Sequence, residues 1–205
     1  MTEIDWSQKY RPFSIEDVIL PEVLGRKLKK LVNQSGGLSL LFFGKPGCGK
    51  TTVGRLINPN NTLYINCTAD NSINMVRELE RKCSSVTLDG SRRVVLLDEA
   101  DYLSKDAQAA LRGVVESLSV TNDFVMTANE PWKLSDAIRS RFFSVCFDFD
   151  EDKELKTDLK ARLWNIAHEE GYTEVADDQI FEIVEYSYPD VRKMLKSLQF
   201  QLQFG

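Results

Sequence analysis

The chain has 205 residues, a formal net charge of -5 and a sequence pI of about 5.1. Hydrophobic residues at 42% and charged residues at 28% are typical of a globular protein with a large core, and the acidic balance argues against a nucleic-acid binder that is basic over its whole surface. No stretch approaches about 18 consecutive apolar residues and the amino terminus carries no apolar signal region, so the sequence predicts neither a membrane span nor secretion.

Residues 1–14 are polar but include three aromatic residues. Arg11 precedes Pro12, which favours an extended or turned backbone at Arg11. A tail of this composition is expected to be disordered unless its aromatic rings pack against another part of the chain.

Strand and helix signals alternate through the middle of the chain. Helices are expected at residues 22–32, 50–57, 72–83 and 104–117, with a further short helix from Ser135. Strands are expected at residues 40–43, 62–67, 94–97, 124–127 and 143–149, and the runs at 62–67 and 94–97 are expected to be buried. This alternation predicts an α/β fold with a parallel sheet that is flanked by helices on both faces.

An acidic stretch at residues 148–152 marks a boundary in the sequence. Beyond it, three segments have apolar residues three and four positions apart and no strand signal, which predicts three helices. These segments are residues 153–168, 177–186 and 189–204. We therefore expect two domains, a nucleotide-binding α/β domain over residues 1–148 and a small helical lid domain over residues 149–205.

A glycine-rich loop follows the first expected strand. Residues 44–51 have the sequence GKPGCGKT, a complete match to the phosphate-binding pattern G-x-x-x-x-G-K-T between a strand and a helix. In this pattern the backbone N–H groups bind phosphate, Lys50 reaches the β- and γ-phosphates, and the Thr51 hydroxyl binds Mg²⁺. A glycine-rich turn without a ligand is the alternative. The expected nucleotide contacts are Gly44, Lys45, Pro46, Gly47, Cys48, Gly49, Lys50, Thr51 and Thr52.

Two carboxylates follow the apolar strand at residues 94–97. Ligands of an open parallel sheet bind at the carboxyl ends of its strands, so Asp98 and Glu99 are expected beside the loop. Asp98 is a candidate ligand of Mg²⁺, and Glu99 is a candidate for polarising the water that attacks the γ-phosphate. The alternative is an acidic cap on the next helix.

The cysteines and the single histidine do not form a metal-binding pattern. Cys48, Cys67, Cys83 and Cys146 are too far apart for a Cys-x-x-Cys zinc site, and His168 has no neighbouring ligand in the sequence. The thiols are expected to be reduced and mostly buried, as in a cytosol-like compartment.

These features together resemble the AAA+ ATPases, and within them the small subunits of sliding-clamp loaders. The resemblance rests on the loop at residues 44–51, the acidic tetrad at residues 98–101, the strand that ends at Asn129, and Ser140-Arg141. Further matches are KYRP at residues 9–12, DAQAALR at residues 106–112 and PDVRK at residues 189–193, so the resemblance covers nearly the whole chain. KYRP together with ILP at residues 19–21 favours the phage-type loader subunits over the archaeal or eukaryotic ones.

The resemblance implies roles for residues outside the loop. Lys9, Tyr10, Arg11 and Pro12 would fold over the adenine and ribose of ATP. Asn129 would act as a first sensor at the attacking water or the γ-phosphate, with a plain turn residue as the alternative. Arg192 would act as a second sensor that links the phosphates to the helical domain, unless it is a solvated arginine on an amphipathic helix. Arg141 would act as an arginine finger on the ATP of a neighbouring subunit, and Arg139 could share this role; a surface arginine is the alternative.

Two features depart from the family pattern. Family members usually have Ser-Arg-Cys where this chain has Ser140-Arg141-Phe142, which keeps the arginine and changes the third position. Loader small subunits also add a helical collar domain that holds their pentamer together, and the sequence ends at Gly205 without one. The chain is therefore expected to be either a truncated form or a compact variant.

The function implied by the resemblance is that of a DNA-stimulated ATPase subunit that loads a polymerase processivity clamp onto primed DNA. ATP and Mg²⁺ are the implied cofactors. The implied partners are other loader subunits in a ring or spiral, the sliding clamp, and primer–template DNA held through its phosphates, in the cytoplasm, nucleoid or eukaryotic nucleus and away from membranes. The candidates for DNA contact are the turn at residues 70–73, Arg77, Lys105 and Arg112, each equally explained as part of a solvated face. Two alternative functions are a helicase or helicase loader, and a structural subunit that binds nucleotide without hydrolysing it.

Overall fold

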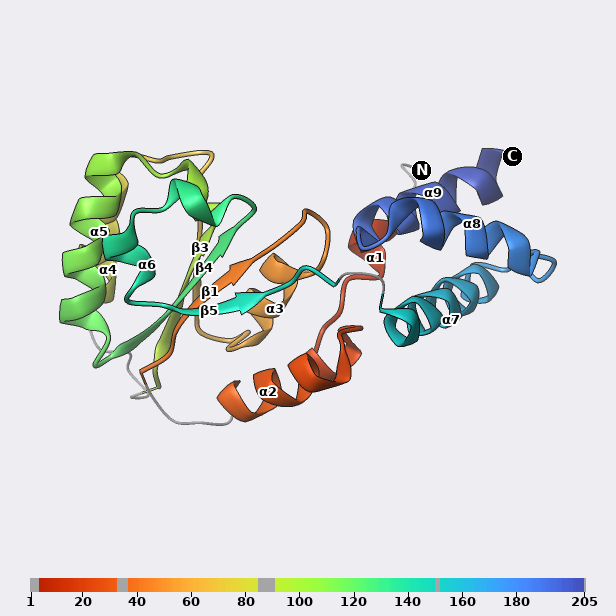
Figure 1. Cartoon of the computed structure of the whole chain (residues 1–205), viewed down its shortest axis with the longest axis horizontal. Helices are drawn as coiled ribbons and strands as arrows, with labels where there is room; N and C mark the ends of the chain where they lie inside the picture. The colour runs from red at the N-terminus through yellow and green to blue at the C-terminus, as the bar shows by residue number, and fades with distance from the viewer. Residues whose placement is uncertain (1–3, 33–36, 85–90, 150–151, 205) are drawn as a thin grey trace. The chain divides into compact units, whose positions relative to one another are not determined.

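The computed structural model describes residues 4–32, 37–84, 91–149 and 152–204. The chain divides into two compact units, which are treated separately below. The sheet unit comprises residues 28–44 and 50–147, and the helical unit comprises residues 1–27, 45–49 and 148–205 (Figure 1). The expected domain division after residue 148 stays a prediction.

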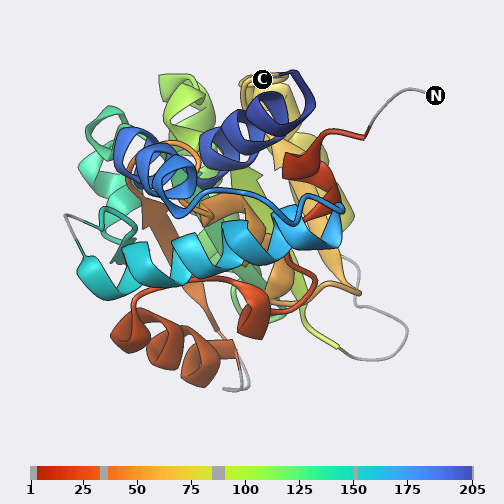
Figure 2. The same ribbon diagram turned by 90° about the vertical axis from the view of Figure 1, so that its right-hand side faces the viewer.

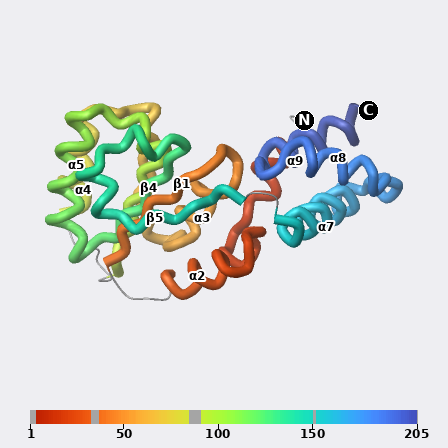
Figure 3. Tube along the Cα trace, in the orientation of Figure 1, coloured from red at the N-terminus to blue at the C-terminus, as the bar shows by residue number. Residues whose placement is uncertain are grey.

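The sheet unit is built on five parallel strands in the order β2-β3-β4-β1-β5. The strands are β1 (Ser39–Phe43), β2 (Thr62–Asn66), β3 (Arg93–Asp98), β4 (Asn122–Ala128) and β5 (Phe143–Cys146). β4 is buried along its whole length, and so is β3 after Arg93, as expected for central strands covered on both faces. Figure 3 shows β1 and β5, which are neighbouring parallel strands of the sheet. The predicted α/β fold with a parallel sheet is confirmed.

Helices cover both faces of this sheet (Figure 1). The elements of the sheet unit are α3 (Lys50–Leu56), α4 (Ile73–Cys83), η2 (Ala100–Tyr102), α5 (Lys105–Leu118), η3 (Pro131–Lys133) and α6 (Asp136–Arg139). On one face, Leu97 joins the apolar residues of α4 and α5 in the hydrophobic core. On the other face, Gly54 of α3 lies so close to the sheet that an added Cβ would be 2.8 Å from Leu96 Cδ1. Neighbouring residues of β3 thus serve opposite faces, because side chains alternate along a strand.

The helical unit contains α7 (Lys153–Glu169), α8 (Asp177–Ser187) and α9 (Val191–Phe204), which confirms the three expected C-terminal helices. It also contains α1 (Trp6–Lys9) and η1 (Ile15–Asp17), while α2 (Glu22–Val32) runs from this unit into the sheet unit. The short helix α1 lies beside α9 (Figure 2). The buried Trp6 attaches it there, because the backbone N–H of Trp6 donates to Gln199 Oε1 at 3.0 Å. Its ring also lies against Tyr172, with 6.3 Å between ring centroids. Trp6 therefore packs, which was the stated condition for order, whereas Phe13 is exposed.

Some expectations about single elements are wrong. β2 is an edge strand and is only half-buried, with Tyr64 38% exposed, whereas the sequence predicted a buried strand. The last strand ends at Cys146 rather than at residue 149. The sequence also has a helix-ending Ser-Gly-Gly at residues 35–37 and predicts a loop at residues 84–93; residues 35, 36 and 85–90 of these segments lie outside the described residues.

Three of the four cysteines are buried and Cys146 is exposed, which agrees with the prediction that the thiols are mostly buried. No helix in the described ranges combines the length and the apolar character needed to cross a bilayer.

Candidate nucleotide-binding site

The glycine-rich loop needs glycine at two positions for its backbone. Gly47 has φ +73° and Gly49 has φ +95°, both in the left-handed region that other residues rarely occupy. A Cβ added to Gly47 would lie 1.8 Å from Asp190 Oδ1, and the Gly47 carbonyl accepts a hydrogen bond from Val191 N–H at 3.2 Å. A Cβ added to Gly49 would meet Val18 at 3.8 Å. Within the helical unit, residues 45–49 are therefore in contact with the start of α9 and with the amino-terminal segment.

Lys50 opens α3 directly after the loop. Its Nζ donates a hydrogen bond to the Gly44 carbonyl at 2.7 Å, and the side chain is buried. The ammonium group therefore lies beside the first residue of the loop, and its contact with the β- and γ-phosphates stays a prediction.

Asp98, the last residue of β3, is the centre of a hydrogen-bond network. Its Oδ1 accepts hydrogen bonds from Thr51 Oγ1 and Thr127 Oγ1, both at 2.6 Å, and its Oδ2 accepts one from Tyr64 OH at 2.9 Å. The network joins α3 to three neighbouring strands and leaves Asp98 buried. The structure therefore brings together Thr51 and Asp98, the two residues that the sequence predicts as Mg²⁺ ligands.

Thr127 and Tyr64 were not predicted as site residues. Met126 pairs with Leu97 across the sheet, so Thr127 and Asp98 come next at the same level of their strands. A hydroxyl at the end of an otherwise apolar strand was the available signal for Thr127. Burial, followed by the hydrogen bond to Asp98, raises the pKa of Tyr64, so its phenol remains a donor to the carboxylate.

Glu99 has a left-handed backbone, with φ 56° and ψ 46°. It is the only non-glycine residue with positive φ in the part of the chain that the structure describes. Its N–H donates to Thr127 Oγ1 at 2.9 Å, so Thr127 bridges the backbone of Glu99 and the carboxylate of Asp98. A left-handed non-glycine residue costs about 1–2 kcal/mol, and such strain is concentrated at functional sites.

Asn129 follows the last residue of β4. The Ala128 carbonyl accepts a hydrogen bond from Gly44 N–H at 3.3 Å, which places the end of β4 beside the start of the loop. Asn129 is half-buried there. Its location agrees with the expected first sensor, and the role itself stays a prediction.

Arg141 lies near the amino-terminal ends of the strands, whereas Asp98 lies at their carboxyl-terminal ends. Phe143, the first residue of β5, pairs with Leu40 near the start of β1, whereas the loop follows the end of β1. The three residue steps from Leu40 to the end of β1 span about 10 Å at about 3.3 Å per residue. Within one chain, the structure does not bring Arg141 to the carboxylate of Asp98.

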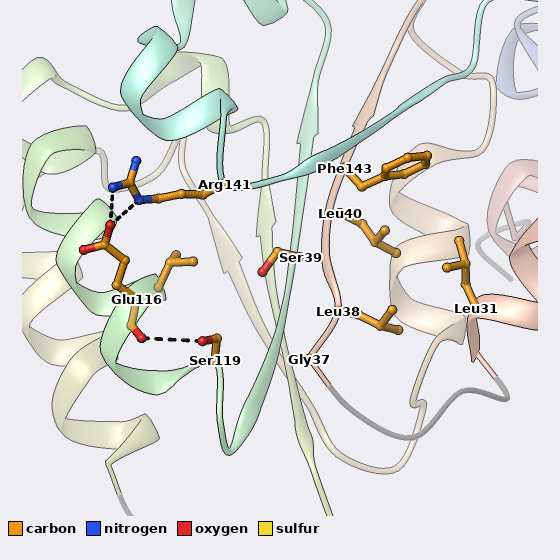
Figure 4. Close-up of a pocket in the computed structure, with 10 residues that line it drawn as sticks. Leu31, Gly37, Leu38, Ser39, Leu40, Glu116, Ser119, Arg141 and Phe143 are labelled. Carbon is orange, nitrogen blue, oxygen red and sulfur yellow. Dashed lines mark hydrogen bonds and ion pairs between the residues drawn. The ribbon is translucent and has the colours of Figure 1, made fainter.

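Both candidate finger arginines are engaged in ion pairs within the sheet unit. Arg141 binds Glu116 of α5, and Arg139 binds Asp136 in the first turn of α6. The Arg141 pair borders a pocket of about 540 Å³ that is also lined by Leu38, Leu40 and Phe143 (Figure 4).

Arg192 is the second residue of α9 in the helical unit. Asp190 caps this helix, because its Oδ1 accepts a hydrogen bond from Lys193 N–H at 2.9 Å. Arg192 lines a pocket of about 600 Å³ along α9, and no hydrogen bond or ion pair of its guanidinium is found among the described residues. Since Val191 contacts Gly47, Arg192 starts next to a residue that touches the loop. Its role as second sensor stays a prediction.

The KYRP segment is held by the end of α7. Lys9 Nζ and Tyr10 OH both donate to Glu170 Oε1, at 2.5 and 2.6 Å. Burial and this hydrogen bond raise the pKa of Tyr10. Burial acts to raise the pKa of Glu170, but the hydrogen bonds from Lys9 and Tyr10 outweigh it, and the pKa is lowered. The expected contact of residues 9–12 with adenine stays a prediction.

The candidate DNA contacts lie in the turn before α4, on α4 and on α5. Ser104 N–H donates to the Asn71 carbonyl at 3.2 Å, so the amino ends of α4 and α5 lie side by side. The candidate cations Arg77, Lys105 and Arg112 are all exposed. DNA binding by this surface stays a prediction.

The residues present fit a Mg²⁺ ion that takes some of its ligands from the protein and the others from the nucleotide. Among the described residues, no group of three or more His, Cys, Asp and Glu side chains could hold a metal ion by itself. Mg²⁺ usually takes one or two carboxylates and completes its shell with phosphate oxygens and water. The adjacent oxygens of Thr51 and Asp98 match that requirement.

Comparisons with known proteins agree with this geometry. The family model described as "ATPase family associated with various cellular activities (AAA)" matches residues 40–148. The replication factor C small subunit of Aeropyrum pernix is 37% identical over 209 residues, which cover 96% of this chain and 62% of that protein. Replication factor C small subunit 2 of Pyrobaculum arsenaticum is 32% identical and covers 100% of this chain and 65% of that protein. The chain thus spans a little under two thirds of the length of these relatives.

Solved structures show the same fold. The Holliday junction branch migration motor RuvB of Thermotoga maritima superimposes with a TM-score of 0.75 at 21% sequence identity, covering 93% of this chain and 64% of that one. At this identity the likeness concerns the fold alone.

Proposed function

We propose a function from one premise: the chain belongs to the AAA family of ATPases. Within this family, it acts as the ATP-hydrolysing motor subunit of a sliding-clamp loader. It couples ATP binding and hydrolysis at subunit interfaces to the loading of a polymerase processivity clamp onto primed DNA. The observation that carries this proposal is the similarity of nearly the whole chain to replication factor C small subunits.

Nucleotide binding follows from the loop and from the network around Asp98. The backbone N–H groups of residues 44–51 and the Lys50 ammonium bind the phosphates of ATP. Thr51 and Asp98 would hold Mg²⁺, which supplies positive charge beside the phosphates when it is bound. Thr127 and Tyr64 keep the Asp98 carboxylate in one orientation, since each donates a hydrogen bond to it.

Hydrolysis depends on Glu99 and Asn129. The Glu99 carboxylate accepts a proton from the water that attacks the γ-phosphate in line with the leaving group. The Glu99 backbone is tied to Thr127, which limits the positions open to that carboxylate. Asn129 donates a hydrogen bond to the same water or to the γ-phosphate, from the end of β4 next to the loop.

Arg141 acts on the ATP of a neighbouring subunit. Its place near the amino-terminal ends of the strands supports action between chains, because the phosphate-binding residues of its own chain lie at the carboxyl-terminal ends. Arg192 completes the site from the second domain, which we take to begin after residue 148, and residues 9–12 complete it from the amino-terminal end of the first domain. Arg192 reads the phosphates, and the KYRP segment covers the adenine and ribose.

The partners of this subunit are other loader subunits, the sliding clamp and primer–template DNA. The neighbouring amino ends of α4 and α5 offer backbone N–H groups to phosphates, and the exposed cations beside them add charge. Such contacts carry no base sequence information, which suits a protein that must act at any primed site. The cytoplasm, the nucleoid or a eukaryotic nucleus is the expected location.

The test of the function is the ATPase rate of the assembled protein with and without primed DNA and clamp. We expect stimulation when both are present. An oligomer that forms normally and hydrolyses ATP at the same rate in all conditions would sink the loader proposal. Strand separation or junction migration by the same preparation would instead favour a helicase.

A substitution separates hydrolysis from nucleotide binding. Glu99→Gln should keep ATP affinity and lose turnover, because the amide cannot accept the proton from water. Glu78→Gln is the matched control, since Glu78 pairs with Lys82 on the exposed side of α4. Normal turnover in Glu99→Gln would move the base elsewhere, and ATP binding without turnover in the unsubstituted assembly would favour a structural subunit.

A further inference from the structure

The guanidinium of Arg141 makes three hydrogen bonds to its own chain. Its Nε donates to Glu116 Oε1 at 2.6 Å, and its Nη2 donates to the same oxygen. Its Nη1 donates to the carbonyl of Ala137, four residues earlier. Figure 4 shows the two bonds to Glu116 on one side of the guanidinium, with the third nitrogen pointing away from that carboxylate.

These contacts leave part of the guanidinium available. Arginine has five N–H donors, one on Nε and two on each terminal nitrogen. Glu116 and Ala137 use one donor on each nitrogen, so one N–H remains on Nη1 and one on Nη2. Two N–H groups on the terminal nitrogens match the spacing of two phosphate oxygens.

We infer that Glu116 is a positioning residue for the arginine finger: it fixes the guanidinium of Arg141 side-on so that the terminal nitrogens are presented to a phosphate of the neighbouring subunit. This inference rests on the proposed action of Arg141 between chains. It adds a residue on α5, far from the phosphate loop in the sequence, to the machinery of that site.

The geometry favours a Glu116 that positions Arg141 for its target over a Glu116 that holds Arg141 away from it. A phosphate can bind the remaining N–H groups without breaking either bond to Glu116. An ordered side chain also loses less conformational freedom when it binds its target. The Arg141 and Glu116 side chains are 27% and 52% exposed, and ion pairs with this exposure stabilise a fold little, so stability alone does not account for the contact.

The test compares three variants in the assembled, DNA-stimulated ATPase. Arg141→Ala should lose most turnover. Glu116→Ala should lower kcat on the order of tenfold with little change in KM for ATP, because the finger is misplaced rather than removed. Glu116→Gln should retain turnover within about twofold, since its amide oxygen still accepts from Nε and Nη2. Glu78→Ala, which instead removes the exposed partner of Lys82 on α4, is the matched control and should behave as the unsubstituted protein.

A mixing experiment tests whether Glu116 acts through the neighbour's site. Assemblies of Glu116→Ala subunits with Lys50→Ala subunits should regain turnover, because the Lys50→Ala chains carry an intact Glu116 and Arg141. A loss of turnover caused by misfolding of Glu116→Ala would not be restored in this way, and its melting temperature would report it.

The outcomes separate this inference from the proposed function. If Arg141→Ala is inactive and Glu116→Ala is fully active, the positioning role is overturned and the finger stands. If both Glu116 variants are more active than the unsubstituted protein, Glu116 restrains the finger and the inference is wrong. Full turnover by Arg141→Ala would overturn the finger and, with it, any need to position it.

Discussion

The left-handed backbone of Glu99 predicts an unusual order of stability among substitutions at that position. In a helix or strand, glycine is less stable than alanine by about 0.5–1 kcal/mol, because it loses more freedom on folding. At φ 56° and ψ 46°, the Cβ of alanine crowds the following carbonyl oxygen, and glycine has no Cβ. We expect Glu99→Gly to be more stable than Glu99→Ala.

The size of the difference follows from these opposing terms. The left-handed conformation costs a residue with a Cβ about 1–2 kcal/mol, and glycine loses about 0.5–1 kcal/mol through its extra freedom in the unfolded chain. The net advantage of Glu99→Gly over Glu99→Ala is about 1 kcal/mol. In a chain of this length, that free energy corresponds to about 2–4 °C in melting temperature.

The assay is thermal unfolding of both variants without nucleotide, together with ATPase rates. Glu78→Gly and Glu78→Ala provide the matched control, because Glu78 is an ordinary exposed residue within α4 and the order should reverse there. Both Glu99 variants should lack turnover, so Glu99→Gly would be more stable than Glu99→Ala although neither variant hydrolyses ATP. Equal melting temperatures, or a more stable Glu99→Ala, would refute the view that strain is stored at Glu99.

Three further predictions concern the loop, the Asp98 network and the amino terminus. Gly47→Ala should weaken nucleotide binding and lower the melting temperature, because its Cβ would lie 1.8 Å from Asp190 Oδ1. Adding Asp190→Ala to this variant should recover part of the lost stability. A double variant that melts no higher than Gly47→Ala would contradict the clash. Thr127→Val should cost about 2 kcal/mol of stability and reduce turnover, since it removes a buried donor to Asp98, and turnover above half of normal would count against the network. Glu170 has a lowered pKa when folded, so its stabilisation is present above its unfolded pKa of about 4.3 and is lost as the pH falls through the folded value. The melting temperature should therefore drop more steeply below about pH 4.3 in the unsubstituted chain than in Glu170→Gln, and parallel curves would exclude this contribution.

The sheet was predictable because apolar periodicity reports burial directly. The run at residues 94–97 has no polar position, and β3 is indeed a central strand with helices on both faces. The run at residues 62–67 has a similar β-forming composition, yet β2 is an edge strand with Tyr64 38% exposed. Local sequence indicates that a strand forms, whereas its place in the sheet depends on which neighbours it pairs with.

The same limit explains what was missed in the site. The loop and the two carboxylates were predicted because each occupies a fixed position in a continuous motif. Thr127 and Tyr64 reach Asp98 from other strands, and only the register of the sheet places their hydroxyls at that carboxylate. Glu116 is likewise 25 residues from Arg141 in the sequence, and an acidic residue on a helix carries no sign of its partner.

The two edges of the sheet bear on how subunits would assemble. Asp98 and Glu99 lie at the carboxyl edge, whereas Arg141 lies near the amino edge, where Glu116 holds it. If Arg141 completes the site of a neighbour, the surface of one subunit that carries Arg141 faces the phosphate-binding surface of the next. These are two different surfaces, so two copies related by a twofold axis could not form this contact. Such head-to-tail contacts close into a ring or continue as a spiral. An oligomer of two subunits at saturating concentrations of a non-hydrolysable ATP analogue would therefore contradict the proposed finger, whereas a larger ring or spiral is the result that the fold of the sheet unit leads us to expect.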